Sequence, residues 1–186
     1  MALTPTTSIP LGFRAPYFEL PDARTGKLLR SDELLREGAS VVVFMCNHCP
    51  FVVHLIEEFV AFSREYAKLG INVVAISSND VENYPQDDVP HMKALAEKLD
   101  FNFPYLYDET QEIARAYDAA CTPDFSVFNE DGICVYRGQF DSSRPGNGLP
   151  VTGEDLRRVC DLLLAGNEVA AKGQIPSIGC NIKWKE

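Results

Sequence analysis

The stretch SVVVFMCNHCP at residues 40–50 decides the fold. Residues 41–45 form an unbroken apolar run rich in β-branched side chains, which is typical of a central strand covered on both faces. Two cysteines, Cys46 and Cys49, follow at once. Pro50 suits the first turn of a helix, because an N–H group there has no intrahelical partner. The stretch therefore predicts a buried strand that runs through a C-x-x-C pair into a helix.

The sequence after Pro50 changes to helical spacing. Apolar residues recur every three or four positions up to residue 69, charged residues fill the other face, and Gly70 suits the end of the helix. Residues 71–76 read as a second buried strand. Residues 40–76 therefore predict a β-α-β unit, in which the two strands run parallel.

Weaker signals place further elements around this unit within one domain over residues 1–186. They predict a short strand over 15–20, helices over 31–36, 89–99, 110–117 and 153–164, a strand over 104–107, and a hairpin from 125–128 to 133–137. Residues 1–13 read as an irregular arm. Residues 166–186 show no periodicity, but they contain isoleucines and the only tryptophan, Trp184, so we expect this tail to pack on the body.

Charge and hydropathy exclude several classes of function. The net charge is −10, from 17 basic and 27 acidic residues, and the basic residues do not cluster. Such a surface repels phosphate backbones and anionic lipids, which argues against nucleic acid and membranes as partners. Residues 1–10 lack the basic and apolar regions of a secretory signal, and no apolar run is long enough to span a bilayer. We expect a cytoplasmic protein; its oligomeric state is not predicted.

The chain has six cysteines, and their spacing singles out Cys46 and Cys49. At the start of a helix, free N–H groups and the helix dipole stabilise a thiolate. We expect Cys46 to attack a disulfide as the thiolate and Cys49 to resolve the mixed disulfide. A structural zinc site usually has two such pairs, and two core cysteines could share this spacing by chance. The redox interpretation is favoured over both.

The motif CNHCPF at residues 46–51 resembles the active-site stretch of thioredoxin-superfamily proteins. Its surroundings are similar to the redoxin branch, which includes the alkyl hydroperoxide reductase/thiol-specific antioxidant (AhpC/TSA) proteins and TlpA-like reductases. Four stretches carry this resemblance: RAPYFEL at 14–20, AISSND at 75–80, FPYLYD at 103–108 and CTPDFSVF at 121–128. It implies an α/β, thioredoxin-like fold, a central mixed β-sheet flanked by helices, with a redoxin-type N-terminal extension and central insertion.

The resemblance also implies roles for residues around the cysteines. Pro123 would be cis and face the C-x-x-C pair, and the backbone of Thr122 would pair with an incoming partner. Asn47 and His48 lie between the cysteines, where a cationic or dipolar imidazole would stabilise the Cys46 thiolate and make the disulfide more oxidising. The alternatives are an ordinary trans proline and a solvent-facing histidine.

The other cysteines are less clear. Cys121 immediately precedes Thr122 and is a candidate third thiol, a metal ligand beside the pair, or an inert buried residue. Cys180, in the tail, is equally open. Cys134 and Cys160 fall within a strand and a helix and are most simply core residues.

Two departures from the family patterns limit the assignment. A peroxiredoxin carries P-x-x-x-[TS]-x-x-C before its peroxidatic cysteine, but here the proline and threonine positions hold Ala39 and Val43. Thioredoxin carries a buried aspartate where this chain has Ser40, so the proton acceptor for Cys49 is unassigned.

The predicted function is therefore that of a thiol–disulfide oxidoreductase using the Cys46–Cys49 couple. Its expected partners are protein or small-molecule thiols and disulfides and a cellular thiol reductant system, with no cofactor and no bound metal. One alternative is a thioredoxin-fold module that binds Cu or Zn through Cys46, Cys49 and Cys121. The other is a thiol-dependent peroxidase, against which the missing threonine counts.

Overall fold

The computed structural model describes residues 3–186 and contains a central five-stranded sheet in the order β6-β5-β4-β8-β9. Strands β4, β5 and β6 are parallel, whereas β8 and β9 are antiparallel to their neighbours. The sheet is thus mixed, as predicted. The strand bounds are β4 Ser40–Phe44, β5 Asn72–Ser77, β6 Tyr105–Tyr107, β8 Asp124–Phe128 and β9 Cys134–Gly138.

Both faces of β4 are buried, which explains its continuous apolar sequence. Val41 and Val43 join one core, with buried residues of α2 Pro50–Ala67, α3 Val89–Lys98 and α5 Glu154–Leu164. Val42 and Phe44 join a second core on the other face. Side chains alternate between the faces of a strand, so a central strand needs apolar residues at every position.

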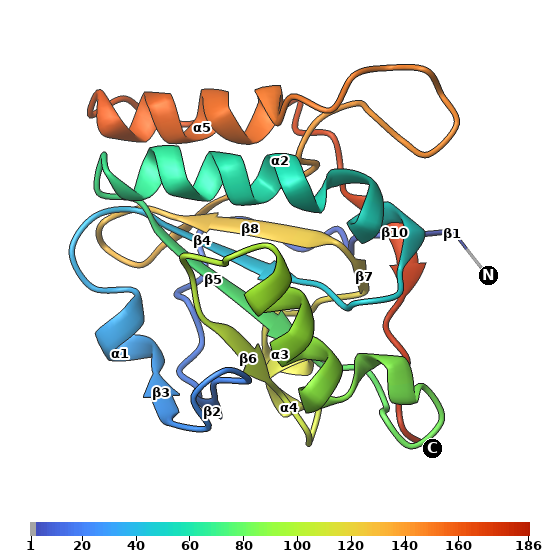
Figure 1. Cartoon of the computed structure of the whole chain (residues 1–186). Coiled ribbons are helices and arrows are strands. Elements are labelled where there is room, and N and C mark those ends of the chain that lie inside the picture. The colour runs from blue at the N-terminus through green and yellow to red at the C-terminus, as the bar shows by residue number, and fades with distance from the viewer. Residues whose placement is uncertain (1–2) are drawn as a thin grey trace.

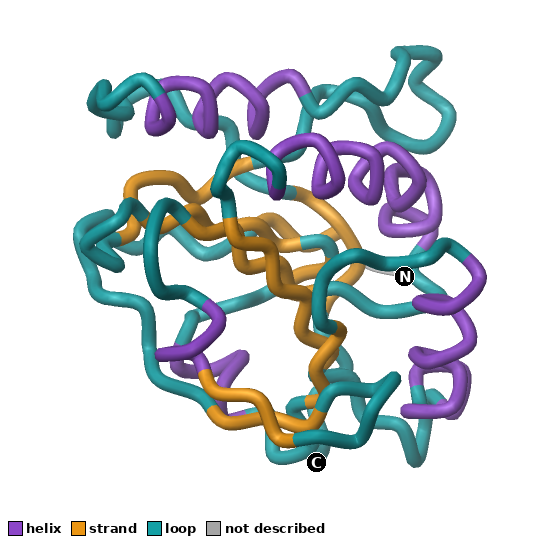
Figure 2. The backbone as a smooth tube through the Cα atoms, turned by 60° about the vertical axis from the view of Figure 1, so that its left-hand side comes forward, coloured by secondary structure: helices purple, strands orange, loops and turns teal. Residues whose placement is uncertain are grey.

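Shorter elements cover the second face of the sheet, with α2 and α5 on the opposite side (Figure 1). These elements are the hairpin of β2 Glu19–Pro21 and β3 Leu28–Arg30, together with α1 Ser31–Leu34 and α4 Glu112–Ala116. In Figure 2 the helices lie outside the strands. Within residues 3–186, no helix has both the length and the apolar character needed to cross a membrane.

The two ends of the chain form a separate small sheet, which the sequence did not predict. Strand β10 Ile178–Asn181 pairs with β1 Leu3–Pro5 on one side and with β7 Cys121–Thr122 on the other. The prediction of an irregular arm over residues 1–13 is therefore wrong for Leu3–Pro5. Such short strands carry no local pattern, because their pairing partners are far away in the sequence.

The tail packs on the body, as predicted. Ile182 is buried in the second core and Trp184 packs against that core. The guanidinium of Arg115 lies 4.5 Å from the centre of the Trp184 ring. These contacts hold β10 at the end of the chain close to the start of α2 (Figure 1).

Candidate active site

The C-x-x-C pair lies where β4 leads into α2, as the sequence predicts. Cys46 follows the end of β4, Cys49 is the N-cap residue of α2, and Pro50 opens the helix. The thiols of Cys46 and Cys49 lie near enough for each to shift the pKa of the other. Both side chains are buried, with 1% and 0% of their surface exposed. The two predicted redox sulfurs therefore form one closely coupled pair inside the protein.

The peptide bond between Thr122 and Pro123 is cis and faces the pair. The Thr122 hydroxyl lies 3.7 Å from Cys46 Sγ, and the Thr122 carbonyl oxygen lies 3.1 Å from Cys49 Sγ. The prediction that Pro123 is cis and lies next to the cysteines is thus confirmed. Thr122 contacts both sulfurs, one through its side chain and the other through its backbone.

The backbone edge of Thr122 is occupied by the chain's own tail. Cys180 of β10 stands opposite Thr122 in an antiparallel register. A Cβ atom at Gly179 would lie 1.9 Å from the Thr122 carbonyl oxygen, so only glycine permits this approach. The expectation that an incoming partner pairs with this edge is therefore corrected, because β10 already fills it.

A buried carboxylate holds the loop between the two cysteines. Asp87 Oδ1 accepts hydrogen bonds from the backbone N–H groups of Asn47 at 2.9 Å and His48 at 3.2 Å. Asp87 Oδ2 lies 2.5 Å from His48 Nδ1 and accepts a bond from Asn79 Nδ2 at 2.9 Å. Asp87 is fully buried at the end of the 3-10 turn Pro85–Asp87.

Asn47 and His48, both predicted to tune the site, are thereby fixed in place. The Asn47 side-chain oxygen accepts a hydrogen bond from the Tyr105 hydroxyl at 2.9 Å. The His48 ring keeps Nδ1 3.9 Å from Cys46 Sγ and stacks on Tyr84 at a centroid distance of 5.9 Å. His48 is thus not a freely solvated loop residue.

Asp87 is a site residue that the sequence reasoning missed. It lies in the polar loop after β5, and β5 runs parallel to β4, which ends at the cysteines. The carboxyl ends of adjacent parallel strands meet at one edge of the sheet, where ligands and functional groups gather in α/β folds. That rule places the loops that begin at residues 45 and 78 together, and it could have identified Asp87 as a candidate.

The surroundings of the two thiols shift their pKa values in opposite directions. Hydrogen bonds from the Cys46 and Cys180 thiols and from the Val52 N–H lower the pKa of Cys49 to about 4, although burial opposes them. The hydrogen bond to Cys49, burial and the charge of Asp87 all raise the pKa of Cys46. The Val52 N–H, at the start of α2, is one of the groups that lower the pKa of the N-cap residue Cys49.

The thiol that contacts the pair belongs to Cys180 and not to Cys121. Cys180 Sγ lies 2.9 Å from Cys49 Sγ. The Cys121 thiol instead faces the carbonyl oxygens of Pro123 at 3.6 Å and Ser177 at 4.0 Å, and burial raises its pKa. The tail therefore supplies the third thiol, for which the sequence analysis named Cys121 as a candidate. Cys134 and Cys160 are buried core residues, as predicted.

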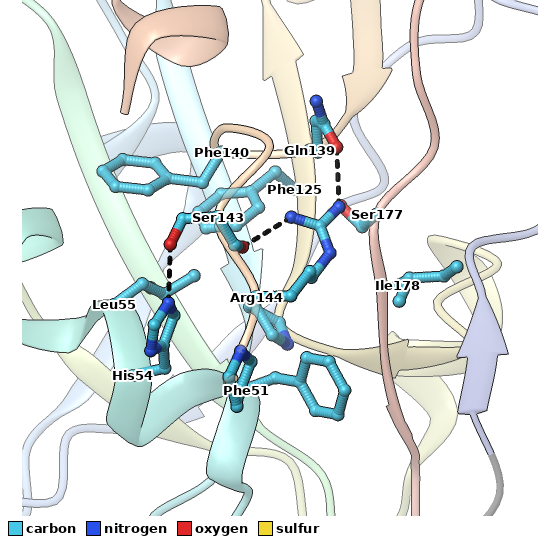
Figure 3. Close-up of a pocket in the computed structure, with 12 residues that line it drawn as sticks. Phe51, His54, Leu55, Phe125, Gln139, Phe140, Ser143, Arg144, Ser177 and Ile178 are labelled. Atoms are coloured by element: carbon cyan, nitrogen blue, oxygen red, sulfur yellow. Dashed lines mark hydrogen bonds between the residues drawn. The ribbon is translucent and has the colours of Figure 1, made fainter. Parts of the chain in front are cut away.

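A small hollow lies beside the cis-proline and the first turns of α2 (Figure 3). Phe51, His54 and Pro123 line it together with Arg144. His54 Nε2 bonds the Ser143 hydroxyl at 2.7 Å, and the Arg144 guanidinium donates to Gln139 Oε1 at 2.6 Å. The hollow combines aromatic surface with one cation, next to the motif that carries the thiols.

Three ligand-type atoms also gather at the site. One atom each from Cys46, His48 and Asp87 lie within 4.8 Å of one another. Sulfur, imidazole and carboxylate are all ligands that zinc accepts. The metal alternative predicted Cys46 with Cys49 and Cys121; the structure groups Cys46 with His48 and Asp87 instead.

Two solved structures are similar to the whole chain. A protein of Geobacillus kaustophilus described as an uncharacterized conserved protein is 52% identical, with a TM-score of 0.96, over 100% of this chain and 97% of that one. A hypothetical protein of Sinorhizobium meliloti 1021 is 47% identical, with a TM-score of 0.94, over 98% of each chain. No curated protein sequence matches the chain.

More distant structures share the fold. Peroxidoxin BcpB of Mycobacterium tuberculosis is 21% identical with a TM-score of 0.63, over 85% of this chain and 98% of that one. A thiol:disulfide interchange protein of Chlorobium tepidum TLS is 20% identical with the same TM-score, over 84% and 99%. These likenesses establish the thioredoxin-like fold. Residues 11–137, more than half of the sequence, match the AhpC/TSA family. The chain therefore belongs to the AhpC/TSA family of thioredoxin-fold proteins.

Proposed function

We propose that this protein is a thiol–disulfide oxidoreductase whose working couple is Cys46 and Cys49. The observation that carries the proposal is the pair itself: two buried thiols at the start of α2 that both contact Thr122, next to the cis Thr122–Pro123 peptide. A thiolate is the species that attacks a disulfide, and a neighbouring thiol resolves the product. The substrates are thiols and disulfides of proteins or small molecules, and a cellular thiol reductant restores the couple.

In the proposed reaction, two electrons pass from the dithiol to the substrate disulfide. Cys46 attacks one substrate sulfur, and the second substrate sulfur leaves as a thiolate while the Cys46 proton passes along the hydrogen bond to Cys49. Cys49 then attacks the Cys46 sulfur of the mixed disulfide. This step releases the first substrate sulfur, which takes up the proton, and leaves the Cys46–Cys49 disulfide. The substrate ends as one thiol and one thiolate, because the resting Cys46–Cys49 pair carried only one proton.

The lowered pKa of Cys49 bears on the reduction potential of the couple. A stabilised thiolate favours the reduced form, and a couple whose reduced form is stabilised is the better oxidant. We expect a reduction potential less negative than the approximately −270 mV of thioredoxin.

The test is a redox titration in a glutathione buffer, performed on the Cys180→Ser variant so that only Cys46 and Cys49 can pair. The expected result is a reversible two-electron transition. It should vanish when Cys46→Ser is added to Cys180→Ser. If Cys46 and Cys49 both remain reduced under strongly oxidising conditions, the proposal is wrong.

A peroxidase function is less well supported. The position of the peroxiredoxin threonine holds Val43, which is buried in the core and offers no hydroxyl. The Thr122 hydroxyl does lie 3.7 Å from Cys46 Sγ, but Thr122 follows Cys46 by 76 residues in the sequence, whereas the peroxiredoxin threonine precedes its cysteine.

A second candidate function is the binding of one zinc ion by Cys46, His48 and Asp87, since their ligand atoms lie together. In that state the carboxylate would exchange its bond to His48 Nδ1 for a bond to the metal. Elemental analysis of protein purified without chelator tests it. Less than about a tenth of an equivalent of zinc would exclude it, because structural sites bind zinc far more tightly than purification can reverse.

A further inference from the structure

Cys49 has a second thiol neighbour besides Cys46. Cys180 Sγ lies 2.9 Å from Cys49 Sγ, although the two residues are 131 positions apart in the sequence. A disulfide bond measures about 2.05 Å, so the two sulfurs need to approach by less than about 1 Å to reach bonding distance. Both side chains are buried.

The position of Cys180 is set by backbone pairing on both sides of its strand. β10 lies between β1 and β7, with Cys180 opposite Leu3 and opposite Thr122. Gly179 lets the strand approach the Thr122 carbonyl oxygen more closely than any residue with a Cβ atom could. The pairing of β10 with β7 thus places the Cys180 thiol against Cys49.

The other buried thiols lack this arrangement. Cys134 Sγ donates to the Tyr136 carbonyl oxygen at 3.5 Å, and Cys121 Sγ donates to the carbonyl oxygens of Pro123 at 3.6 Å and Ser177 at 4.0 Å. Burial raises the pKa of Cys134 to about 11 and that of Cys160 to about 12. The pKa of Cys180 is raised to a similar value, so what distinguishes Cys180 is its position: its Sγ lies 2.9 Å from the sulfur of a redox cysteine.

We propose that Cys49 is shared by two alternative disulfides, Cys46–Cys49 and Cys49–Cys180, which interconvert within one molecule. This inference rests on the proposed function, which supplies the Cys46–Cys49 disulfide. The Cys180 sulfur attacks the Cys49 sulfur, the Cys49–Cys180 bond forms, and the Cys46–Cys49 bond breaks. Cys46 leaves as the thiolate and takes the proton that Cys180 gives up. The step is an exchange, so it needs no further oxidant or reductant.

Oxidation of the pair removes some of the interactions that raise the pKa values of Cys46 and Cys180. In the reduced protein, the interaction with Cys49 raises the pKa of Cys46. Burial and, to a smaller extent, the hydrogen bond with Cys49 raise the pKa of Cys180 to about 12. A Cys49 that has entered a disulfide carries no charge, so these contributions disappear. Burial still opposes both thiolates, and direct passage of the proton between the two thiols avoids forming either one in isolation.

The consequence for the chemistry is that the oxidised protein can present a free Cys46. The oxidising equivalent is then held in the Cys49–Cys180 bond, between the body and the tail. Cys46 faces His48 and Thr122 as a thiol and can attack another disulfide. The third sulfur thus gives the site two oxidised states in place of one.

Disulfide mapping of the full chain tests this proposal. Wild-type protein and the variants Cys46→Ser, Cys180→Ser and Cys121→Ser are oxidised with oxidised glutathione and quenched in acid. They are then denatured, alkylated with N-ethylmaleimide and digested without reduction. Peptides joined through Cys49 and Cys180 are expected in wild type and in Cys46→Ser. Cys180→Ser should contain only the Cys46–Cys49 disulfide, and Cys121→Ser should match wild type.

The outcomes separate this inference from the proposed function. If Cys180→Ser forms Cys46–Cys49 but oxidised Cys46→Ser leaves Cys49 and Cys180 fully alkylated, the shared-sulfur proposal is overturned and the oxidoreductase proposal stands. If neither disulfide forms in any protein, both are overturned. Cys180→Ala serves as a second variant should Cys180→Ser fold poorly, and the mapping of wild type needs no substitution.

Discussion

At the scale of single residues, the charge on Cys49 is the property with the most direct spectroscopic consequence. The pKa of Cys49 is lowered to about 4 by its hydrogen bonds, those from Cys46 and Cys180 among them. The reduced protein at neutral pH therefore contains a thiolate. We expect its ultraviolet thiolate absorbance to persist as the pH is lowered from neutral and to disappear as the pH falls through about 4.

Two variants give this titration its controls. Cys49→Ser should lack the transition, whereas Cys134→Ser should keep it, because burial raises the pKa of Cys134 to about 11. Circular dichroism over the same pH range monitors the fold. A transition only near the ordinary thiol value of about 8.5 would show that the helix start and the neighbouring thiols do not hold the charge.

Asp87 supports a second prediction at this scale. Asp87→Asn keeps the shape of the side chain but removes the charge that accepts from Asn47, His48 and Asn79. Hydrogen bonds to a charged group are worth about 1.5–3 kcal/mol, so we expect the free energy of unfolding to fall by about 2 kcal/mol. The pKa of Cys46 should fall as well, because the Asp87 charge contributes to raising it.

Urea denaturation measures the stability change, and Asp88→Asn is the matched control. Asp88 caps α3 by accepting from the His91 N–H at 3.0 Å, and asparagine caps a helix about as well as aspartate. If the two variants lose the same free energy of unfolding, the hydrogen bonds to the Asp87 carboxylate do not stabilise the protein as expected.

The residues of the site differ in how far the sequence could identify them. The C-x-x-C spacing identifies Cys46 and Cys49. The resemblance of residues 121–128 to a family stretch identifies Thr122 and Pro123. Asp87 and Cys180 have no such signal. Asp87 reaches the cysteines only through the path of the loop after β5, and Cys180 only through a strand at the far end of the chain. Charge placement also depended on which cysteine became the N-cap residue.

At the scale of elements, the fit of β10 against β7 depends on Gly179. An added Cβ atom would meet the carbonyl oxygen and carbon of Thr122 at 1.9 and 2.7 Å, and these are backbone atoms that cannot rotate away. We expect Gly179→Ala to lower the free energy of unfolding by about 1–3 kcal/mol, as overpacking does. It should also speed alkylation of Cys180 in the native protein, because β10 must move off β7.

Gly173→Ala in the same tail is the control for the cost of removing a glycine. Gly173 has a φ of +82° but no atom within 4 Å of its added Cβ. We expect Gly173→Ala to lower the free energy of unfolding by about 1 kcal/mol through backbone strain. Cys180 should be alkylated as slowly in this variant as in wild type. If Gly179→Ala behaves in the same way, the close contact with Thr122 does not position the tail.

The elements that were predicted well are those whose own residues show which side chains are buried. β4, α2 and β5 each carry a continuous or periodic apolar signal, and each appears within two residues of its expected bounds. β1 is three residues long and β10 is four, and the two strands form by pairing with each other. A pairing between the two ends of a chain leaves no periodicity in either segment.

At the scale of the whole molecule, the N-terminal segment is tied to the sheet through a buried charge pair. Asp124 in β8 and Arg137 in β9 are both buried. The Thr6 hydroxyl stands between them: it donates to Asp124 Oδ1 at 2.6 Å and accepts from Arg137 Nη2 at 3.0 Å. Asp124 directly follows Pro123, so this bridge joins the start of the chain to the active-site strand.

The bridge predicts the effect of Thr6→Val, which preserves the shape of the side chain and removes the hydroxyl. A buried carboxylate and guanidinium each lose a partner, so we expect the free energy of unfolding to fall by about 2 kcal/mol. For a chain of this size the melting temperature should drop by about 6 °C. Thr110→Val, at an exposed position whose hydroxyl accepts one bond from the Glu112 N–H at 3.4 Å, should change it little.

Hydrogen exchange shows whether this loss reaches the thiols. Residue 6 follows β1 directly, and β1 holds one side of β10, which carries Cys180. Loosening the N-terminal segment should therefore speed amide exchange in β10 while β4 and β5, at the centre of the main sheet, exchange as in wild type. Faster exchange throughout the molecule would contradict this view, since it would mean that the terminal sheet and the main sheet open together. Unchanged exchange in β10 would mean that β7 alone keeps Cys180 against Cys49.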